Sequence, residues 1–235
     1  MTEKKRVEQH PCYGEVHITT NPRARRIILR ARAGFIEVTI PPYTTRKSLN
    51  DALVKHGDKL LAQCKANSPQ TIGPDYRIER EGFAFGLQAT DRSEFHMGYS
   101  GNEATLYYPA STTFGEPAMQ EWLRRVRTTA LRKIAQKHLP QRLAQLATQH
   151  GLAFSSVTLR NSHSRWGSCS SRRTISLSIY LQLLPQHLAD YVMLHELCHT
   201  VEMNHGERFW KLLDSLTDGK AKQLRKELKG YKTDF

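Results

Sequence analysis

Two histidines and a glutamate stand close together in the segment His195-Glu196-Leu197-Cys198-His199. His195 and His199 are four residues apart, so on an α-helix their rings leave the same face one turn from each other. Two imidazoles at that spacing can bind one Zn²⁺ at about 2.0–2.1 Å each. Glu196 stands beside this face, where a carboxylate can take a proton from a water whose pKa the metal lowers to about 7. The segment therefore predicts a metal-dependent hydrolase with Glu196 as its general base.

Two protein nitrogens do not complete a zinc site, so a third ligand is expected nearby. His205 follows His199 by six residues and is the predicted third ligand, provided that the helix stops near Met203 and the chain doubles back. Glu202 and Glu207 are rival ligands, because carboxylates also bind zinc. Glu202, however, lies two helical turns beyond the first histidine, which favours His205.

The residues before and after this segment have the apolar spacing of helices that pack against a core. A largely apolar run precedes the histidines, made up of Leu188, Tyr191, Val192, Met193 and Leu194. A second apolar helical pattern follows them, made up of Phe209, Trp210, Leu212, Leu213 and Leu216. We therefore expect a core helix to carry the histidines and another helix to pack behind the site.

The first 114 residues are predicted to form a β-rich region with one helix. We expect, in order, a polar lead-in over 1–22, a hairpin from Ile27–Leu29 and Phe35–Ile40, a helix over 44–63 and a loop over 67–75. Short strands around 76–79, 83–88, 94–99 and 105–108 complete a small antiparallel β region. No internal repeat is apparent in the sequence.

A connector that contains glycine and proline, Ser111 to Pro117, places the expected domain boundary at 114/115. The second domain, 115–235, begins with a long helix that Pro140 is expected to kink or divide. Strands are predicted over 157–160 and 174–180, ahead of the helix that carries the histidines. The chain is therefore predicted to be an α+β protein.

The chain is basic, with a formal net charge of +13 over 235 residues. The excess gathers in three places: Arg23, Arg25, Arg26, Arg30 and Arg32; Arg124, Arg125, Arg127, Arg132, Lys133, Lys137 and Arg142; and Arg160, Arg165, Arg172 and Arg173. Such clusters are either solvated faces or a surface that binds nucleic acid through its phosphates. Both interpretations are open at this point.

The composition also bears on location. No run of apolar residues approaches the 18 that a membrane span needs, and no apolar stretch follows the charged start. The four cysteines, Cys12, Cys64, Cys169 and Cys198, lie far apart and predict reduced thiols. We therefore expect a cytoplasmic protein without a membrane partner.

The segment Arg165-Trp166-Gly167-Ser168-Cys169 precedes a predicted strand, a helix introduced by proline with H-E-L-C-H, and N-H-x-x-x-F-W. This combination resembles the YgjP-like family of predicted zinc metallopeptidases, which is related to the SprT-like and small gluzincin-type peptidases. The resemblance implies a zincin-like catalytic domain with a mixed sheet and a metal-binding active-site helix. It also implies that His195, His199 and His205 bind Zn²⁺, with Glu196 as general base. A peptide would lie against the strand after Arg165–Cys169, taken as an edge strand.

A second donor for the oxyanion is expected in such a site, and Arg165, His163 and Tyr180 are candidates for it or for substrate contacts. Alternatively, Arg165 and Trp166 stack on each other and hold the loop. The predicted function is a zinc-dependent peptidase that acts on a peptide or protein. The alternatives are a nucleic-acid-associated protein that acts on DNA-bound proteins or uses zinc structurally, and a metal-dependent hydrolase of a non-peptide substrate.

Overall fold

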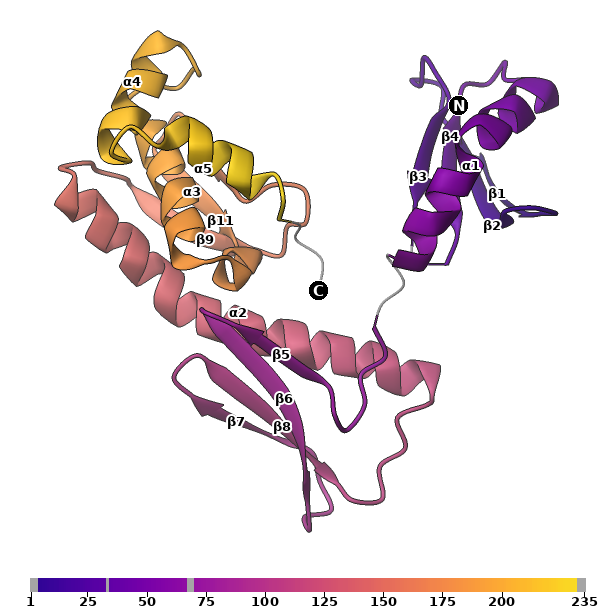
Figure 1. Cartoon of the computed structure of the whole chain (residues 1–235), viewed down its shortest axis with the longest axis horizontal. Helices are drawn as coiled ribbons and strands as arrows, with labels where there is room; N and C mark the ends of the chain where they lie inside the picture. Colours follow the sequence, from indigo (N-terminus) through magenta and orange to yellow (C-terminus); the bar gives the residue numbers. More distant parts are fainter. Residues whose placement is uncertain (1–3, 33, 67–69, 232–235) are drawn as a thin grey trace. The chain divides into compact units, whose positions relative to one another are not determined.

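The computed structural model describes residues 4–32, 34–66 and 70–231, and the chain forms two compact units (Figure 1). The units are Met1–Gln70 and Thr71–Phe235. The boundary expected at 114/115 falls inside the second unit, between a sheet and a long helix. The physical reason is a shared core, because Phe83 and Phe85 of that sheet belong to the same buried cluster as Leu131 and Leu143 of the helix.

The first unit is a four-stranded sheet with one helix. Its elements are β1 (Lys4–His10), β2 (Gly14–Thr20), β3 (Ile28–Ala31), β4 (Ile36–Ile40) and α1 (Arg46–Ala66). The strand order is β1-β2-β4-β3; β2 and β4 are parallel and the other two pairs antiparallel. The expected hairpin of β3 with β4 is confirmed, whereas the polar lead-in over 1–22 is wrong, because β1 and β2 occupy that segment. Residues 67–69 of the expected loop lie outside the described residues.

The second unit begins with another four-stranded sheet, β5 (Arg77–Arg80), β6 (Phe83–Thr90), β7 (His96–Ser100) and β8 (Glu103–Pro109). The predicted strands are present, but the region is not purely antiparallel, since the central pair β6 and β8 is parallel. Residue patterns alone do not distinguish a parallel from an antiparallel neighbour.

The two sheets have the same topology, so the structure contains a repeat that is not apparent in the sequence. The strand order β5-β6-β8-β7 and its pairing directions reproduce β1-β2-β4-β3 position by position, and a helix follows each sheet. The turn after the last strand repeats too. Thr44 N–H donates to the Pro41 carbonyl, and Thr112 N–H donates to the Pro109 carbonyl. We call these two sheet-and-helix segments the first copy and the second copy.

The rest of the second unit carries the histidines. Its elements are α2 (Pro117–Gln149), β9 (Ser156–Arg160), β10 (Gly167–Cys169), β11 (Thr174–Ser178), the 3-10 helix η1 (Ile179–Leu183), α3 (Gln186–Cys198), α4 (Glu207–Leu216) and α5 (Ala221–Leu228). Pro140 does not divide α2, which runs on as one helix (Figure 1). The carbonyl that loses its partner to this proline belongs to Gln136, whose residue is exposed.

The third sheet has the order β10-β11-β9, with β10 antiparallel and β9 parallel to β11. The strand predicted to be an edge, β11, is therefore central, and β10 and β9 are the edges. The sequence pattern did not indicate β10, because this strand spans only three residues.

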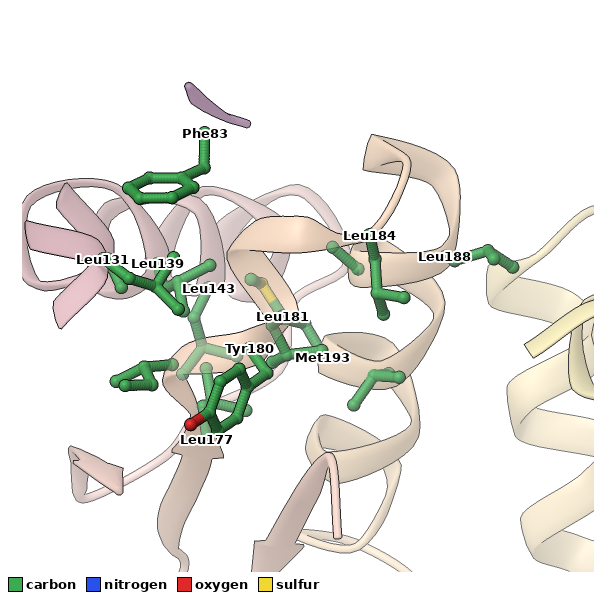
Figure 2. Close-up of a cluster of buried hydrophobic side chains, with 14 of the residues drawn as sticks. Phe83, Leu131, Leu139, Leu143, Leu177, Tyr180, Leu181, Leu184, Leu188 and Met193 are labelled. Carbon is green, nitrogen blue, oxygen red and sulfur yellow. The ribbon is translucent and has the colours of Figure 1, made fainter. Parts of the chain in front are cut away.

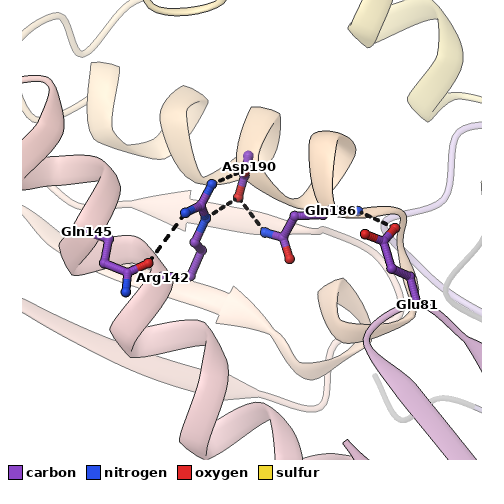
Figure 3. A network of polar contacts seen from close by, with 5 residues as sticks. All are labelled: Glu81, Arg142, Gln145, Gln186 and Asp190. Carbon is purple, nitrogen blue, oxygen red and sulfur yellow. Dashed lines mark hydrogen bonds and ion pairs between the residues drawn. The ribbon is translucent and has the colours of Figure 1, made fainter.

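Apolar and polar contacts hold α3 in place. Figure 2 shows Leu181 and Met193 from η1 and α3 packed among the leucines of α2. Figure 3 shows the polar side, where Arg142 of α2 donates to both carboxylate oxygens of Asp190, at 2.9 and 2.6 Å. At the start of α3, the Gln186 N–H donates to Glu81 Oε2 at 3.0 Å. The helix that carries the histidines is thus bound to α2 and to the turn between β5 and β6.

Within the described ranges, no helix is long and apolar enough to cross a membrane. The predicted α+β class is confirmed.

Candidate metal centre

The end of α3 and the turn after it bring three histidines together. Nitrogen atoms of His195, His199 and His205 all lie within 4.8 Å of one another. The helix ends at Cys198 and a turn follows, in which the Glu202 N–H donates to the Cys198 carbonyl at 2.8 Å. His205 then reaches His195, with 3.0 Å between their Nε2 atoms. Three imidazoles facing one point are a donor set suited to a divalent cation.

Burial favours the neutral form of two of these imidazoles, which is the form that binds a metal. Burial lowers the pKa of His195 to about 4, helped by the nearby His199 and His205. Burial also lowers the pKa of His199. The Nδ1 of His199 lies 3.1 Å from the backbone carbonyl oxygen of Glu202, which can only accept a hydrogen bond. This contact places the ring proton on Nδ1 and leaves Nε2 as the ligand atom.

An aromatic side chain forms the floor of the histidine cluster. Phe209 of α4 is fully buried, and its ring centroid lies 4.9, 4.6 and 4.7 Å from those of His195, His199 and His205. The neighbouring Trp210 donates from Nε1 to the His205 carbonyl at 3.1 Å. The helix predicted to pack behind the site therefore restrains all three rings.

Glu196 is buried next to β10. Its residue is 5% exposed, and Oε2 has no hydrogen-bond partner in the described structure. Burial raises the pKa of its carboxyl to about 7. Gly167 of β10 packs directly against it, since a Cβ at Gly167 would lie 2.7 Å from both Cγ and Oε1 of Glu196. The absent side chain at residue 167 is thus what makes room for the carboxylate.

The backbone of β10 is open along the side away from β11. Ser178 N–H donates to the Trp166 carbonyl and Ser170 N–H to the Thr174 carbonyl, so residues 166, 168 and 170 point their peptide groups at β11. In an antiparallel pair the alternate residues point the other way. Gly167 and Cys169 therefore present N–H and C=O groups at the free edge, beside Glu196.

Comparisons with known proteins bear on this arrangement. The family model for the YgjP-like metallopeptidase domain matches residues 25–231. The chain belongs to this family.

One solved structure is similar to part of this YgjP-like chain: the metallopeptidase zymogen abylysin of Pyrococcus abyssi. The match has 21% sequence identity and a TM-score of 0.36, and it covers 39% of this chain and 92% of that one. A search of curated proteins finds no match. The family match is thus what makes the chain a metallopeptidase.

The predicted oxyanion donors of the YgjP-like domain lie in different surroundings. The Tyr180 hydroxyl and His163 Nε2 form a hydrogen bond of 2.8 Å, so the structure brings these two together. Tyr180 is buried, and the charges that act on its pKa, which burial raises, belong to Arg127 and Arg132 of α2. Arg165 is exposed on the loop before β10. An oxyanion or substrate role for any of the three stays a prediction.

The basic cluster of α2 is not one open face. Arg127 is buried, donates from Nη1 to the Tyr76 hydroxyl and lies over the Tyr76 ring at 5.7 Å. Arg125 forms an ion pair with Glu121 at 3.5 Å, and Arg142 is bound to Asp190. Part of this cluster is therefore structural, and nucleic-acid binding stays a prediction.

Sequence reasoning missed two features of the site. Gly167 was recognised only as part of the R-W-G-S-C segment, and its contact with Glu196 follows from packing between β10 and α3. Phe209 was expected in the core, but not beneath all three rings. Sequence spacing gives no signal for this contact, because His205 precedes the first residue of α4, Glu207.

Proposed function

We propose that this YgjP-like protein is a zinc-dependent metallopeptidase that hydrolyses peptide bonds, with Glu196 as general base. One observation carries the proposal: three imidazoles face a single point, and a buried carboxyl whose Oε2 has no hydrogen-bond partner among the described residues lies on the same turn of helix.

The donor set fits Zn²⁺. His195, His199 and His205 would hold the ion and leave one tetrahedral position open, which is the pattern of catalytic rather than structural zinc sites. Ligand atoms on one tetrahedral zinc are about 3.4 Å apart, so the rings need only small movements from their present separations. When bound, the ion supplies Lewis acidity and lowers the pKa of water.

Glu196 would move the proton. A base works best when its pKa lies near the working pH, and burial brings the pKa of this carboxyl to about 7. The carboxylate takes a proton from the attacking water as oxygen adds to the scissile carbonyl carbon. It then gives that proton to the leaving amine as the C–N bond breaks, and so returns to its starting state.

The free edge of β10 would hold the substrate. An extended peptide can add to it as a further strand, bound by the outward peptide groups of Gly167 and Cys169. These bonds use only main-chain atoms and demand little of the substrate sequence. Because Gly167 touches Glu196, the bound backbone lies next to the base. This edge strand beside an active-site helix is also the arrangement of the proposed zincin-like fold.

The test separates the base from the metal ligands. Glu196→Gln should abolish hydrolysis of an unfolded protein substrate while elemental analysis still finds one zinc per chain. His205→Ala should lower both zinc content and hydrolysis. Glu207→Gln, which removes an exposed carboxylate from the next helix, is the control and should change neither. Hydrolysis by the Glu196→Gln variant at the wild-type rate would overturn the role of Glu196.

A further inference from the structure

Helix α5 carries a positive charge close to the histidine cluster. The guanidinium of Arg225 lies over the Trp210 ring, with its carbon 5.1 Å from the ring centroid. The centroid of that ring lies 6.4 Å from that of His195 and 6.0 Å from that of His205. The charge of Arg225 also reaches His195, because it adds to burial and to the other two histidines in lowering the pKa of that ring. A cation therefore stands beside the residues that would hold the metal.

The structure fixes the position of this cation from two directions. Trp210 donates from Nε1 to the His205 carbonyl at 3.1 Å, so the ring beneath the guanidinium is itself bound to the site. Helix α5 is bound to α3 through His187 and Glu227, whose Nε2 and Oε1 atoms are 2.8 Å apart. The helix that carries Arg225 is therefore held against the helix that carries the metal-binding segment.

The charge of Arg225 is not neutralised by the protein. The nearby carboxylates are engaged elsewhere: Glu227 pairs with His187, and Asp214 accepts from the N–H of Ala221, the first residue of α5, at 3.2 Å. In the described part of the chain, Arg225 forms no ion pair, and its residue is exposed. A guanidinium presents its N–H donors in a planar fork that matches a carboxylate. Arg225 is therefore free to bind an anionic group that arrives at the site.

Arg225 and strand β10 approach the histidines from different sides of α3. Glu196 faces β10, because Gly167 packs directly against it. Arg225 lies near Tyr191, where burial raises the pKa of the phenol and the charge of Arg225 opposes this rise. Five residues separate Tyr191 from Glu196, which turns their side chains about 140° from each other around the helix, with His195 between them. A substrate that lies along β10 on one side of the histidines therefore meets Arg225 on the other.

We propose that Arg225 determines specificity by binding a carboxylate of the substrate next to the scissile bond. The carboxylate belongs to an acidic side chain or to the C-terminus of the substrate, since the same fork fits both. The inference rests on the proposed function, because it concerns the substrate of that site. The competing role is structural, with Arg225 only holding Trp210 in place. A structural role affects every ligand of the metal alike, whereas recognition affects only ligands that carry a carboxylate.

The test measures binding rather than hydrolysis. Four succinyl hydroxamates, which bind zinc through the hydroxamate, are titrated into the full-length zinc-loaded protein by isothermal titration calorimetry. Two carry glutamate amide or glutamine amide and differ only in a side-chain carboxylate. Two carry alanine or alanine amide and differ only in a terminal carboxylate. The carboxylate probe of at least one pair should bind about tenfold more tightly than its amide partner, as expected for a charge-assisted hydrogen bond. The pair that shows this preference identifies the source of the carboxylate.

Three variants assign the preference to Arg225. Arg225→Gln should reduce it to within twofold, and Arg225→Lys, which keeps the charge but not the fork, should retain part of it. Lys226→Gln removes the same charge from the next, also exposed, residue of α5 and should leave the preference unchanged.

Equal binding within both pairs, or a preference that survives Arg225→Gln, would overturn the proposal. So would a loss of affinity in Arg225→Gln that is the same for all four probes, because this is the result of a purely structural role. Failure of all four probes to bind would contradict the proposed zinc site on which the inference rests, whereas a missing preference refutes the role of Arg225 alone.

Discussion

Replacing Glu196 by glutamine in the metal-free protein should change how the free energy of unfolding depends on pH. Burial raises the pKa of this carboxyl from 4.5 to about 7, so the folded chain holds the proton more tightly than the unfolded chain does. The stabilising contribution of the protonated carboxyl is fully present below pH 4.5 and is lost as the pH rises through about 7. Glutamine does not titrate, so the variant does not lose stability in this window.

The size of the effect follows from the two pKa values. Each pKa unit corresponds to about 1.4 kcal/mol, which gives about 3 kcal/mol in all, most of it between pH 5 and pH 8. Over that range, the stability of the variant relative to wild type should rise by about 2–3 kcal/mol. His195 acts in the opposite direction, because its pKa is lowered to about 4 and its contribution is lost as the pH falls. That term is common to both proteins and cancels in the difference.

Urea unfolding in the presence of EDTA, followed by tryptophan fluorescence, measures this difference. All three tryptophans lie in the second unit, so the signal reports on the unit that contains Glu196. Glu207→Gln controls for the loss of an exposed carboxylate. The cost of burying an amide does not depend on pH and so does not affect the comparison. A constant difference between variant and wild type from pH 5 to pH 8 would refute the burial argument for Glu196.

Three further substitutions test the packing of the site. Gly167→Ala places a methyl group 2.7 Å from Glu196 Cγ and should displace the carboxylate; we expect kcat/KM to fall about 100-fold with zinc content unchanged, and unchanged kcat/KM would contradict the contact. Phe209→Ala removes the floor of the histidine cluster and should cost about 3–5 kcal/mol in urea unfolding, with weaker zinc binding in a chelator competition. A loss below about 1 kcal/mol would argue against that packing. Asp190→Ala leaves the partly exposed Arg142 guanidinium without its carboxylate and should cost about 1–2 kcal/mol by thermal unfolding, solvent screening included. Equal stability would show that this ion pair does not hold α3.

The parts of the site that were predictable are those set by local geometry. The spacing of His195 and His199 fixes their relation as soon as the segment is helical, and the apolar run before them indicates the helix. His205 was a stronger assumption, because its position depends on where the helix ends. The contact of Gly167 with Glu196 could not be predicted, since it joins two residues far apart in the sequence across a strand and a helix.

In the fold, too, local elements could be predicted from the sequence and long-range pairings could not. Helix α1 and the strands from β5 to β8 follow from periodicity, and the structure places them within a few residues of their predicted bounds. Strand β1 was missed because its core-facing positions carry Arg6, Glu8 and His10, which erase the alternation that signals a half-buried strand. Strand pairing is non-local, so the parallel neighbours β2 and β4 and the central position of β11 had no signal in the sequence pattern.

The internal repeat explains why strand β1 was missed. Equivalent core positions hold different residues, such as Val16 and Phe85 or Ile36 and Ala104. The two copies therefore share their topology without a recognisable sequence repeat. In the second copy, apolar residues on and before β5 complete the core against a long helix. In the first copy, the corresponding strand carries Arg6, Glu8 and His10 on the same face, so polar side chains stand where apolar ones complete the core of the second copy.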